Sequence, residues 1–591
     1  MSPCRTRLFT MSLCAAMLAA LPVHAGMAQA RAADAGVAEK DVATRLHAVF
    51  DADQTWRREE YGWVQVDGRW RMGDRMPSVA PADWVRRIAH WEQTLQALDA
   101  IPEAGLSNED RVSAAVFRTS LEASLNNAQW RTWEAPFNSD TFFWGDHTPR
   151  QPWRSEAEWT SFITRMGDLP RYFDEQIANM QRGLARGWSV PRATLDGRDE
   201  TIVPYTRSDA GNPLLAALEA MPASIPEPAR TRLQTEGRKV VLEQVVPAYA
   251  RLLAFIREEY MPRARSTIAA SDLPDGAAFY RSQIREYVTL DMAPEDIHAL
   301  GLAEVERITA EMHEVMARAG FKGTLAEFMQ FLRSDPQFYA KTPDELLHYT
   351  AWIAKQVDGQ LKHTIGILPR YRFTIVPVPD DIAPTYTAGR GGLESCMFNT
   401  YDLASRPLYN LPALTLHECS PGHSFQAALA LEAPERPDFR QSTYFSGYGE
   451  GWALYTEWLG KQMGIYQTPY EDFGRLTFEM WRAARLVIDT GLHEYGWTRQ
   501  QAIDYLAGHA ALAHHDVVNE VDRYISWPGQ ALSYYIGYKT IRDLREEAER
   551  ALGARFDQKT FHDTILGLGS VPLPVLEEEV RAYIARQAAA Q

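Results

Sequence analysis

The sequence predicts a mainly α-helical fold arranged in two lobes. Three observations lead to this prediction: the length of the chain, the number of helix-start signals and the scarcity of strand patterns. A chain of 591 residues is longer than one hydrophobic core usually serves, so we expect two helical lobes or one large bilobal domain. With 46% apolar residues, 23% charged residues and 17 Trp, the composition is that of a folded globular protein. We place an N-terminal helical lobe over residues 31–285 and a C-terminal lobe over residues 286–591.

Residues 1–30 have the pattern of a secretory signal peptide. Two arginines precede an apolar run from Leu8 to Val23, which is too short and too close to the N-terminus for a membrane span. Small residues end two candidate cleavage sites, at Ala25 and at Ala30, and the choice between them stays open. No other stretch reaches the roughly 18 apolar residues of a membrane helix. We therefore expect an exported, periplasmic protein without a membrane span.

The cysteines and the net charge limit the cross-links and partners of the chain. Lipidation at Cys14 is disfavoured, because Leu13 is larger than the residue that a lipoprotein cleavage site accepts there. Cys396 and Cys419 remain after the signal peptide; they can pair in an oxidising compartment, but two separate buried thiols are favoured. The formal net charge of −16 disfavours nucleic acid and anionic lipid as partners, since both need a basic face. A peptide or another small substrate stays open.

Helix signals dominate the second half of the chain. Thr342, Thr468 and Thr498 each stand three residues before a Glu or Gln, which is the capping-box spacing at the start of a helix. The first two are followed by proline, which favours the first helical position. Between Pro294 and Ala319 apolar residues recur at helical spacing with charges between them. We expect a helix to begin at each of these four places.

Strand patterns are few. The clearest are Arg372–Val378 and Leu393–Tyr401, which lie on either side of a loop with three glycines. We expect these two segments to pair as a small antiparallel sheet. The stretch from about 194 to 228 is rich in Pro, Gly, Asp and Ser and is expected to be a loop or the connection between lobes.

The segment from His417 to His423 has the residues with the most specific chemistry. His417 and Glu418 match the His-Glu start of a zinc-protease helix, in which two imidazoles bind the metal and the adjacent Glu is the base. The second His usually follows four residues after the first, on the same helix face, but here it follows six residues after. In a straight helix six residues turn His423 by about 120° away from His417, so the two imidazoles would not meet at one metal.

Pro421 and Gly422 lie between the two histidines and change this expectation. Proline removes a backbone donor and crowds the carbonyl four residues earlier, while glycine tolerates whatever conformation follows. We expect a kink or bulge that returns His423 to the metal. The alternative is an ordinary helix in which both histidines find partners within the fold.

A second segment supplies a third ligand. Glu450 lies 27 residues after His423, a distance that fits a loop and a return helix. Glu457, seven residues later, shares its helix face and is expected to support the ligands or to lie at a packing edge. The predicted zinc ligands are therefore His417, His423 and Glu450, with the fourth position open for water, as in catalytic zinc sites.

These segments resemble the bacterial domain of unknown function 885 family. Its pattern His-Glu-x-x-Pro-Gly-His followed by Glu-Gly-Trp-Ala matches His417–His423 and Glu450–Ala453, and the resemblance extends over most of the chain after the signal peptide. The chain departs from the family at Ser424, where the family usually has a second His directly after the first. The resemblance implies a helical zinc-peptidase-like fold, akin to thimet oligopeptidase and angiotensin-converting enzyme. With the two lobes and the small sheet expected from the sequence, the predicted fold is bilobal and helical, with the sheet beside the metal helix.

One later segment offers a candidate for stabilising the transition state. Arg482, Arg485, Asp489 and His493 fall at three- and four-residue spacings on one helix face. If this face lines the cleft, His493 is placed to donate to the developing oxyanion and Asp489 to orient it. A salt-bridged surface would show the same spacing.

Three further residues are candidates for contacts with substrate. Tyr534, at a position that matches the family pattern, is the candidate oxyanion donor, and Arg523 is a candidate for binding a substrate carboxylate. The strand at 393–401 is expected to be an edge strand that holds an extended peptide by backbone pairing, with Asn399 contacting the polar groups of that peptide.

The function that these features favour is an exported zinc metallopeptidase that hydrolyses short peptides. Zinc would lower the pKa of a bound water, and Glu418 would take the proton of that water and pass it to the leaving amine. One alternative is a zinc hydrolase of esters or N-acyl amino acids, because an activated water serves any polarised carbonyl. Another is a non-catalytic periplasmic binding protein, although a structural metal site has no need of the base beside its ligand.

Overall fold

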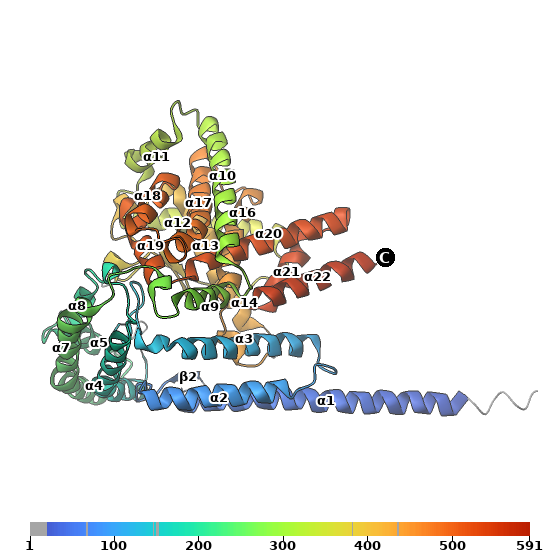
Figure 1. Cartoon of the computed structure of the whole chain (residues 1–591), viewed down its shortest axis with the longest axis horizontal. Coiled ribbons are helices and arrows are strands. Elements are labelled where there is room, and N and C mark those ends of the chain that lie inside the picture. The colour runs from blue at the N-terminus through green and yellow to red at the C-terminus, as the bar shows by residue number, and fades with distance from the viewer. Residues whose placement is uncertain are drawn as a thin grey trace, which may run out of the picture.

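The computed structural model describes residues 21–66, 69–145, 147–148, 153–380, 382–433 and 436–590 (Figure 1). Within these ranges the fold is mainly helical, as predicted, and two small sheets contain the strands. Residues 1–20 lie outside the described residues, so the greater part of the predicted signal peptide does too. No helix among the described residues is long and apolar enough to cross a membrane.

The N-terminal part begins with a layer of long helices and a hairpin. The helices are α1 (Leu21–Glu60), α2 (Pro81–Asp99) and α3 (Asn108–Trp130), and Figure 1 shows α2 and α3 lying along one another. Strands β1 (Trp63–Val66) and β2 (Arg69–Met72) pair antiparallel. A small core holds the three helices together, and its buried members include Leu46, Phe50, Trp91, Phe117 and Leu121.

A second group of helices has its own core. Its members are α4 (Glu156–Ala185), α5 (Pro213–Glu219), α6 (Glu227–Val240), α7 (Val246–Phe255) and α8 (Met261–Arg263). The last three continue one another through wider π turns at 241–245 and 256–260. Pro247 and Pro262 follow these turns, and because proline has no N–H for the helical ladder, the wider turn accommodates it.

The remaining helices share the largest core, which surrounds α17. They are α9 (Gly276–Val288), α10 (Pro294–Arg318), α11 (Leu325–Ser334), α12 (Pro343–Thr364), α13 (Leu411–Glu418), α14 (His423–Glu432), α15 (Phe439–Ser442), α16 (Ser446–Gln462), α17 (Pro469–His493), α18 (Arg499–His509), α19 (His514–Ser526), α20 (Ser533–Leu552), α21 (Gln558–Leu568) and α22 (Leu573–Ala589). Every residue of α17 from Glu471 to His493 is buried. Helix α10 lies along α17 (Figure 1), with Gly301 against Leu486 and Val487.

The predicted helix starts are confirmed. The hydroxyls of Thr342, Thr468 and Thr498 accept hydrogen bonds from the backbone N–H three residues later, at the starts of α12, α17 and α18. Helix α10 begins at Pro294. The boundary that we placed at residue 285 lies inside α9, whose buried residues Phe279, Tyr280 and Ile284 belong to the largest core. The stretch 194–228 contains short helical turns and α5 rather than loop alone.

The predicted antiparallel pairing of the two clearest strands is wrong. Strands β3 (Thr374–Pro377) and β5 (Ser395–Phe398) are parallel, and β4 (Gly389–Gly391) pairs antiparallel with the other side of β5. The chain crosses over after β3 and forms β4 from the glycine-rich segment that we took for a loop. Since β5 is central in the order β3-β5-β4, it is not an edge strand, and β3 and β4 form the two edges of the sheet.

The prediction of two separate thiols is also wrong. Cys396 on β5 and Cys419 directly after α13 form a disulfide, with their Cα atoms 5.5 Å apart and both side chains fully buried. The pairing of β5 beside α13 brings the two cysteines together, which their separation of 23 residues does not reveal. The disulfide joins the sheet to the helix that ends at Glu418.

Candidate metal centre

The helix with the His-Glu pair is interrupted after Glu418. Helix α13 ends at Glu418 and α14 begins at His423, so the chain makes a complete break rather than the kink that we expected. At the break, a Cβ on Gly422 would lie 1.8 Å from the carbonyl oxygen of His417, so a residue with a side chain does not fit there. The indole of Trp452 on α16 donates to the carbonyl of Pro421 at 2.8 Å. The break brings the His417 and His423 rings to 4.9 Å between centroids.

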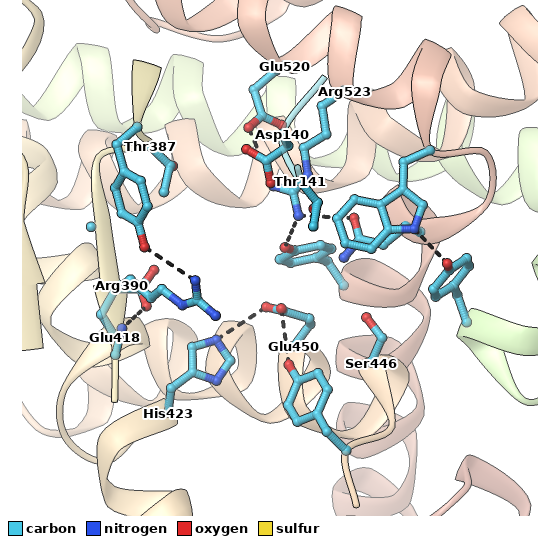
Figure 2. Close-up of a pocket in the computed structure, with 18 of the residues that line it drawn as sticks. Asp140, Thr141, Thr387, Arg390, Glu418, His423, Ser446, Glu450, Glu520 and Arg523 are labelled. Atoms are coloured by element: carbon cyan, nitrogen blue, oxygen red, sulfur yellow. Dashed lines mark hydrogen bonds and ion pairs between the residues drawn. The ribbon is translucent and has the colours of Figure 1, made fainter. Parts of the chain in front are cut away.

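Glu450 completes a group of three metal-ligand side chains. Its Oε2 lies 3.5 Å from His417 Nε2 and 3.3 Å from His423 Nε2, and Figure 2 shows His423 and Glu450 directed toward one another. One ligand atom from each side chain lies within 4.8 Å of the other two. Two ligands about 2.1 Å from a tetrahedral zinc ion are about 3.4 Å apart, so these spacings match a common ion.

Buried partners hold the ligands in position. Glu457 Oε1 lies 2.8 Å from His417 Nδ1, and Thr456 donates to the carbonyl of Leu416 at 2.9 Å. A carboxylate on one imidazole nitrogen keeps the proton there and leaves the other nitrogen for a metal. Glu457 is therefore the residue that orients His417, with its Nε2 toward Glu450.

The charged side chains at the candidate centre shift one another's pKa values. Burial by itself would lower the pKa of His417, but hydrogen bonds to Glu450 and Glu457 and the charge of Glu418 raise that pKa to about 9. Burial would raise the pKa of Glu450, yet His423 and His417 hold it well below the usual range. The raised pKa of His417 favours a proton on that imidazole, which a bound metal ion would have to displace.

Glu418 stands beside the ligands without being one of them. Its Oε2 accepts a hydrogen bond of 2.6 Å from the backbone N–H of Gly391 on β4, and Figure 2 places it next to Arg390. A Cβ on Gly391 would lie 1.9 Å from the Glu418 carbonyl oxygen, so only glycine lets the strand come this close. The edge of the sheet thereby positions the predicted base.

A cavity of about 2440 Å³ opens onto the centre. Its walls come from α1 and α3 of the N-terminal layer and from β4, α13, α16, α17, α19 and α20. Three of the predicted substrate-contacting residues, Asn399, Arg523 and Tyr534, line this cavity together with the ligands and Glu418. The sequence-predicted residues are thus mostly brought to one place.

Tyr534 and Arg523 are neighbours on the cavity wall. The Tyr534 ring lies 6.4 Å from the His417 ring. The Arg485 guanidinium lies over the Tyr534 ring, 4.0 Å from the ring centre. Arg523 Nη2 donates to the Tyr534 hydroxyl at 3.3 Å and to Gln530 Oε1 at 3.2 Å. Because the Tyr534 oxygen accepts this bond, its own hydrogen is free to be donated elsewhere.

The predicted oxyanion role of His493 does not fit the structure. His493 is fully buried and is not among the residues that line the cavity. Its Nδ1 accepts from the Ala270 N–H at 2.9 Å, its Nε2 contacts the Tyr524 carbonyl at 3.0 Å, and burial lowers its pKa to about 3. Asp489 binds the Tyr280 hydroxyl and the Gly529 N–H instead of orienting His493. Helix α17 continues from the cavity into the core. Arg482 and Arg485 therefore line the cavity, while Asp489 and His493 on the same helix face are buried in the core.

Asn399 has a supporting position rather than the predicted contact with substrate. Its Nδ2 donates to the carbonyl oxygens of Ala383, Tyr386 and Thr387 at 2.8 to 3.2 Å, and its Oδ1 accepts from the Tyr401 N–H at 3.0 Å. The side chain is 1% exposed. Since its amide is occupied by the loop before β4, Asn399 positions that strand.

Sequence reasoning missed Tyr444. Its hydroxyl donates to Glu450 Oε1 at 3.1 Å, from the segment just before α16. A Cβ on Gly449 would lie 2.3 Å from the Tyr444 ring, so the glycine before Glu450 makes room for the tyrosine. The Gly449-Glu450-Gly451 pattern was the available signal, because small residues on both sides of a ligand indicate close packing around it.

Solved structures of similar fold come from two bacteria. A "putative lipoprotein" from Colwellia psychrerythraea is 28% identical, with a TM-score of 0.83 over 93% of this chain and 99% of that chain. A "putative lipoprotein of unknown function" from Shewanella oneidensis is 17% identical, with a TM-score of 0.62 over 92% of this chain and 98% of that one, and shows likeness of fold alone. No curated protein matches the chain. The family model described as bacterial protein of unknown function (DUF885) matches residues 64–580, and the chain belongs to this family.

Proposed function

We propose that the protein is an exported zinc metallopeptidase that hydrolyses short peptides. The observation that carries this proposal is the arrangement of His417, His423 and Glu450 at the mutual spacing of metal ligands, with Glu418 beside them on the wall of a large cavity. Three protein ligands leave a position for water or substrate, which is typical of catalytic rather than structural zinc sites.

The residues at the centre fit a zinc ion. Two imidazoles and one carboxylate are a common donor set for zinc, and Glu450 Oε2 is buried without a hydrogen-bond partner. When bound, zinc would polarise the scissile carbonyl and acidify a water molecule. The positive charge of the ion would replace the proton on His417 as the partner of the Glu450 carboxylate.

The chain's own groups would carry the proton transfers. The Gly391 N–H holds the Glu418 carboxylate, which is positioned to take a proton from the attacking water and to return it to the leaving amine. Tyr534, whose oxygen accepts from Arg523, is free to donate its hydroxyl hydrogen to the developing oxyanion. Tyr444 holds the other oxygen of Glu450 and keeps that carboxylate directed at the histidines.

The free edge of β4 suits an extended peptide. Backbone hydrogen bonds from Asn399 to Ala388 and from Gly392 to Ser395 show that residues 388, 390 and 392 face β5. The residues between them turn their backbone groups away from the sheet, and Gly389 lines the cavity. In this proposal a substrate strand pairs there, beside the metal helix, in a bilobal zinc-peptidase-like fold.

The proposed location is the periplasm. The predicted signal peptide and the fold shared with bacterial putative lipoproteins both support export. The disulfide near the metal helix also suits an oxidising compartment.

Two competing functions remain to be separated by experiment. The metal centre suits a hydrolase of esters or N-acyl amino acids as well, because the same chemistry acts on any polarised carbonyl. A non-catalytic binding protein would keep the fold and the metal without turnover. We expect peptides to be cleaved faster than matched esters or N-acyl amino acids, and an acyl substrate that is cleaved faster would favour the first competitor.

The test of the proposal is a comparison of wild-type protein with Glu418→Gln, both loaded with zinc. We expect the variant to keep one zinc per chain and to lose about 10²- to 10⁴-fold in kcat, because the base has been removed while the ligands stay. Zinc content by elemental analysis and hydrolysis of short peptides measure the two quantities. If wild-type protein binds no zinc, or if both proteins cleave equally fast, the peptidase proposal is wrong.

A further inference from the structure

One wall of the cavity, formed by α17 and α19 beside Tyr534, holds more positive charge than its neighbours neutralise. Arg482, Arg485 and Arg523 all line the cavity there. Figure 2 shows Arg523 with Glu520 on this wall, facing Glu450 across the cavity. These three guanidinium groups are called the arginine wall below.

Within the described ranges, the arginine wall has fewer carboxylates within 4 Å than it has guanidinium groups. Glu520 lies 2.8 Å from Arg485 and 3.7 Å from Arg523, so one carboxylate serves two guanidinium groups. Arg482 has Glu457 at 3.7 Å, but the same Glu457 oxygen lies 2.8 Å from His417 Nδ1. The wall therefore has three cations against two carboxylates, one of which is committed to a metal ligand.

Hydrogen bonding shows the same surplus of donors. Among the described residues, Arg482 Nε, Arg485 Nη1 and Arg523 Nε are buried nitrogens without a hydrogen-bond partner. The hydrogen bonds of Arg523 go to two neutral oxygens, on Gln530 and Tyr534, at 3.2 and 3.3 Å. Bonds from a guanidinium to a carboxylate are normally shorter and about twice as strong, so Arg523 has capacity for an anionic partner.

Besides Glu520, the charges of Asp140 and Glu450 act on Arg523, and Glu450 is taken up by the candidate metal centre. Asp140 lies next to Arg523 and Glu520 in Figure 2, and its side chain is exposed. No ion pair within 4 Å joins Asp140 to Arg523 among the residues that the structure describes. Solvent weakens the charge of an exposed acid, and without a direct contact Asp140 leaves the guanidinium of Arg523 open to a bound carboxylate.

The arginine wall is close to the candidate metal. Arg523 touches Tyr534, and the Tyr534 ring lies 6.4 Å from the ring of His417. The Tyr534 side chain alone thus separates the Arg523 guanidinium from the candidate metal ligands. One or two residues of an extended peptide, at about 3.3 to 3.6 Å each, are long enough to span that gap. An anion held at Arg523 therefore belongs to the residue or residues next to the bond that is cleaved.

We propose that the arginine wall binds the free C-terminal carboxylate of the substrate through Arg523, so that the protein removes residues from the C-terminal end of short peptides. This inference rests on the proposed peptidase function. The backbone of an internal peptide segment carries no charge to match the surplus, whereas a terminal carboxylate supplies it to every substrate regardless of sequence. An acidic side chain next to the scissile bond has the same chemistry, and the experiment separates the two sources.

The test compares three peptides with the zinc-loaded wild-type protein: one sequence as the free acid, the same sequence as the C-terminal amide, and that amide with Asp in place of its last residue. We expect kcat/KM for the free acid to exceed that for the plain amide by about tenfold or more. Equal rates for the free acid and the plain amide would overturn the proposal. An aspartyl amide cleaved as fast as the free acid would overturn the assignment to the C-terminus.

Variants then tie the preference to Arg523. We expect Arg523→Gln to reduce the ratio of free-acid to amide cleavage toward one, mainly through KM, and Arg523→Lys to restore part of it. The ratio is the informative quantity, because any effect on Tyr534 changes both rates alike. Arg285→Gln is the matched control: Arg285 lines the same cavity from α9, is exposed, and should leave the ratio unchanged. A preference that survives in Arg523→Gln would contradict the proposal.

A binding measurement keeps this inference separate from the peptidase proposal. In zinc-loaded Glu418→Gln protein, the free-acid peptide should bind about tenfold or more tightly than the amide in calorimetry, and Arg523→Gln should remove the difference. If wild-type protein cleaves none of the peptides while this binding difference is present, the peptidase proposal fails and the carboxylate site stands. Equal affinities in the Glu418→Gln protein would overturn the carboxylate site itself.

Discussion

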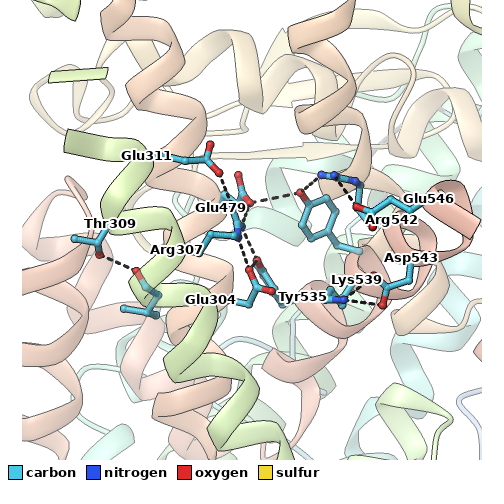
Figure 3. Close-up of polar contacts among 12 residues, drawn as sticks. Glu304, Arg307, Thr309, Glu311, Glu479, Tyr535, Lys539, Arg542, Asp543 and Glu546 are labelled. Atoms are coloured by element: carbon cyan, nitrogen blue, oxygen red, sulfur yellow. Dashed lines mark hydrogen bonds and ion pairs between the residues drawn. The ribbon is translucent and has the colours of Figure 1, made fainter. Parts of the chain in front are cut away.

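Two groups of buried charge in the C-terminal part differ in whether they are complete. The first is an ionic network between α10, α17 and α20 (Figure 3), which does not contact the cavity. Its members are Glu304, Arg307, Glu311, Asp472, Arg475, Glu479 and Tyr535. The second is the candidate metal centre with the arginine wall, where Glu450 Oε2 and three guanidinium nitrogens have no hydrogen-bond partner. In the network Arg475 Nη2 also lacks a hydrogen bond, but it lies 2.9 Å from the Asp472 carboxylate.

The network is closed because each of its arginines contacts at least two carboxylates, whereas the arginine wall has fewer carboxylates than guanidinium groups. Arg475 lies 2.9 Å from Asp472 and 2.8 Å from Glu479, and Arg307 also contacts Glu479. Burial would raise the pKa of Glu479, but Arg475 and Arg307 lower it. The difference teaches that buried charge alone does not mark a functional site; buried charge that stays unmatched and faces a cavity does.

The largest effect is expected on zinc affinity when a candidate metal ligand is removed. We expect Glu450→Ala to weaken zinc binding at least about a hundredfold, because two imidazoles alone hold the ion poorly. A competition titration with a chelator measures the affinity. Glu122→Ala, which removes an exposed acid on α3 from the same cavity, should bind zinc like the wild type. Unchanged affinity in Glu450→Ala would show that these three residues do not form the site.

Removing a charge from the closed network should affect stability instead. We expect Arg475→Met to lower the free energy of unfolding by about 3–5 kcal/mol, because Asp472 and Glu479 lose a buried partner. Denaturant unfolding measures this loss, and the zinc affinity of the folded protein should not change. Lys539→Met, which removes the exposed pair with Asp543, should cost about 0–1 kcal/mol. Weaker zinc binding in folded Arg475→Met would remove the distinction between the two groups.

A smaller effect is expected at the residue that orients His417. Glu457→Gln keeps an acceptor for the His417 Nδ1 proton but removes the charge, and we expect zinc affinity to fall about 10- to 100-fold. The same chelator titration measures it. An affinity equal to that of the wild type would mean that α13 alone orients the imidazole.

Much of the site was predictable because its determinants are local. The hydroxyl caps at Thr468 and Thr498 mark the starts of α17 and α18 through bonds within one turn. The His417-Glu418 pair, the Pro421-Gly422 step and Glu450 were recognisable from residue type and spacing. Whether the three ligands meet was an expectation from sequence, and their positions in the fold agree with it.

Other features depend on contacts between distant segments and were not predictable. The direction of β3 relative to β5 depends on a crossover that leaves β4 on the other side of β5, and the cysteine pair follows from that arrangement. His493 belongs to a face that runs from the cavity into the core, so its spacing from Arg485 did not show where the cavity ends.

The sequence by itself determined the helical character of the chain, the starts of its best-marked helices and the identity of the candidate metal ligands, since each follows from hydrogen bonds and side-chain chemistry within a few residues. The tertiary structure alone decided which strands form the edges of the sheet, which histidine is buried in the core and which arginine lacks a carboxylate of its own. Each of these properties depends on residues from separate parts of the chain that meet only in the folded protein, so no local sequence pattern predicts it.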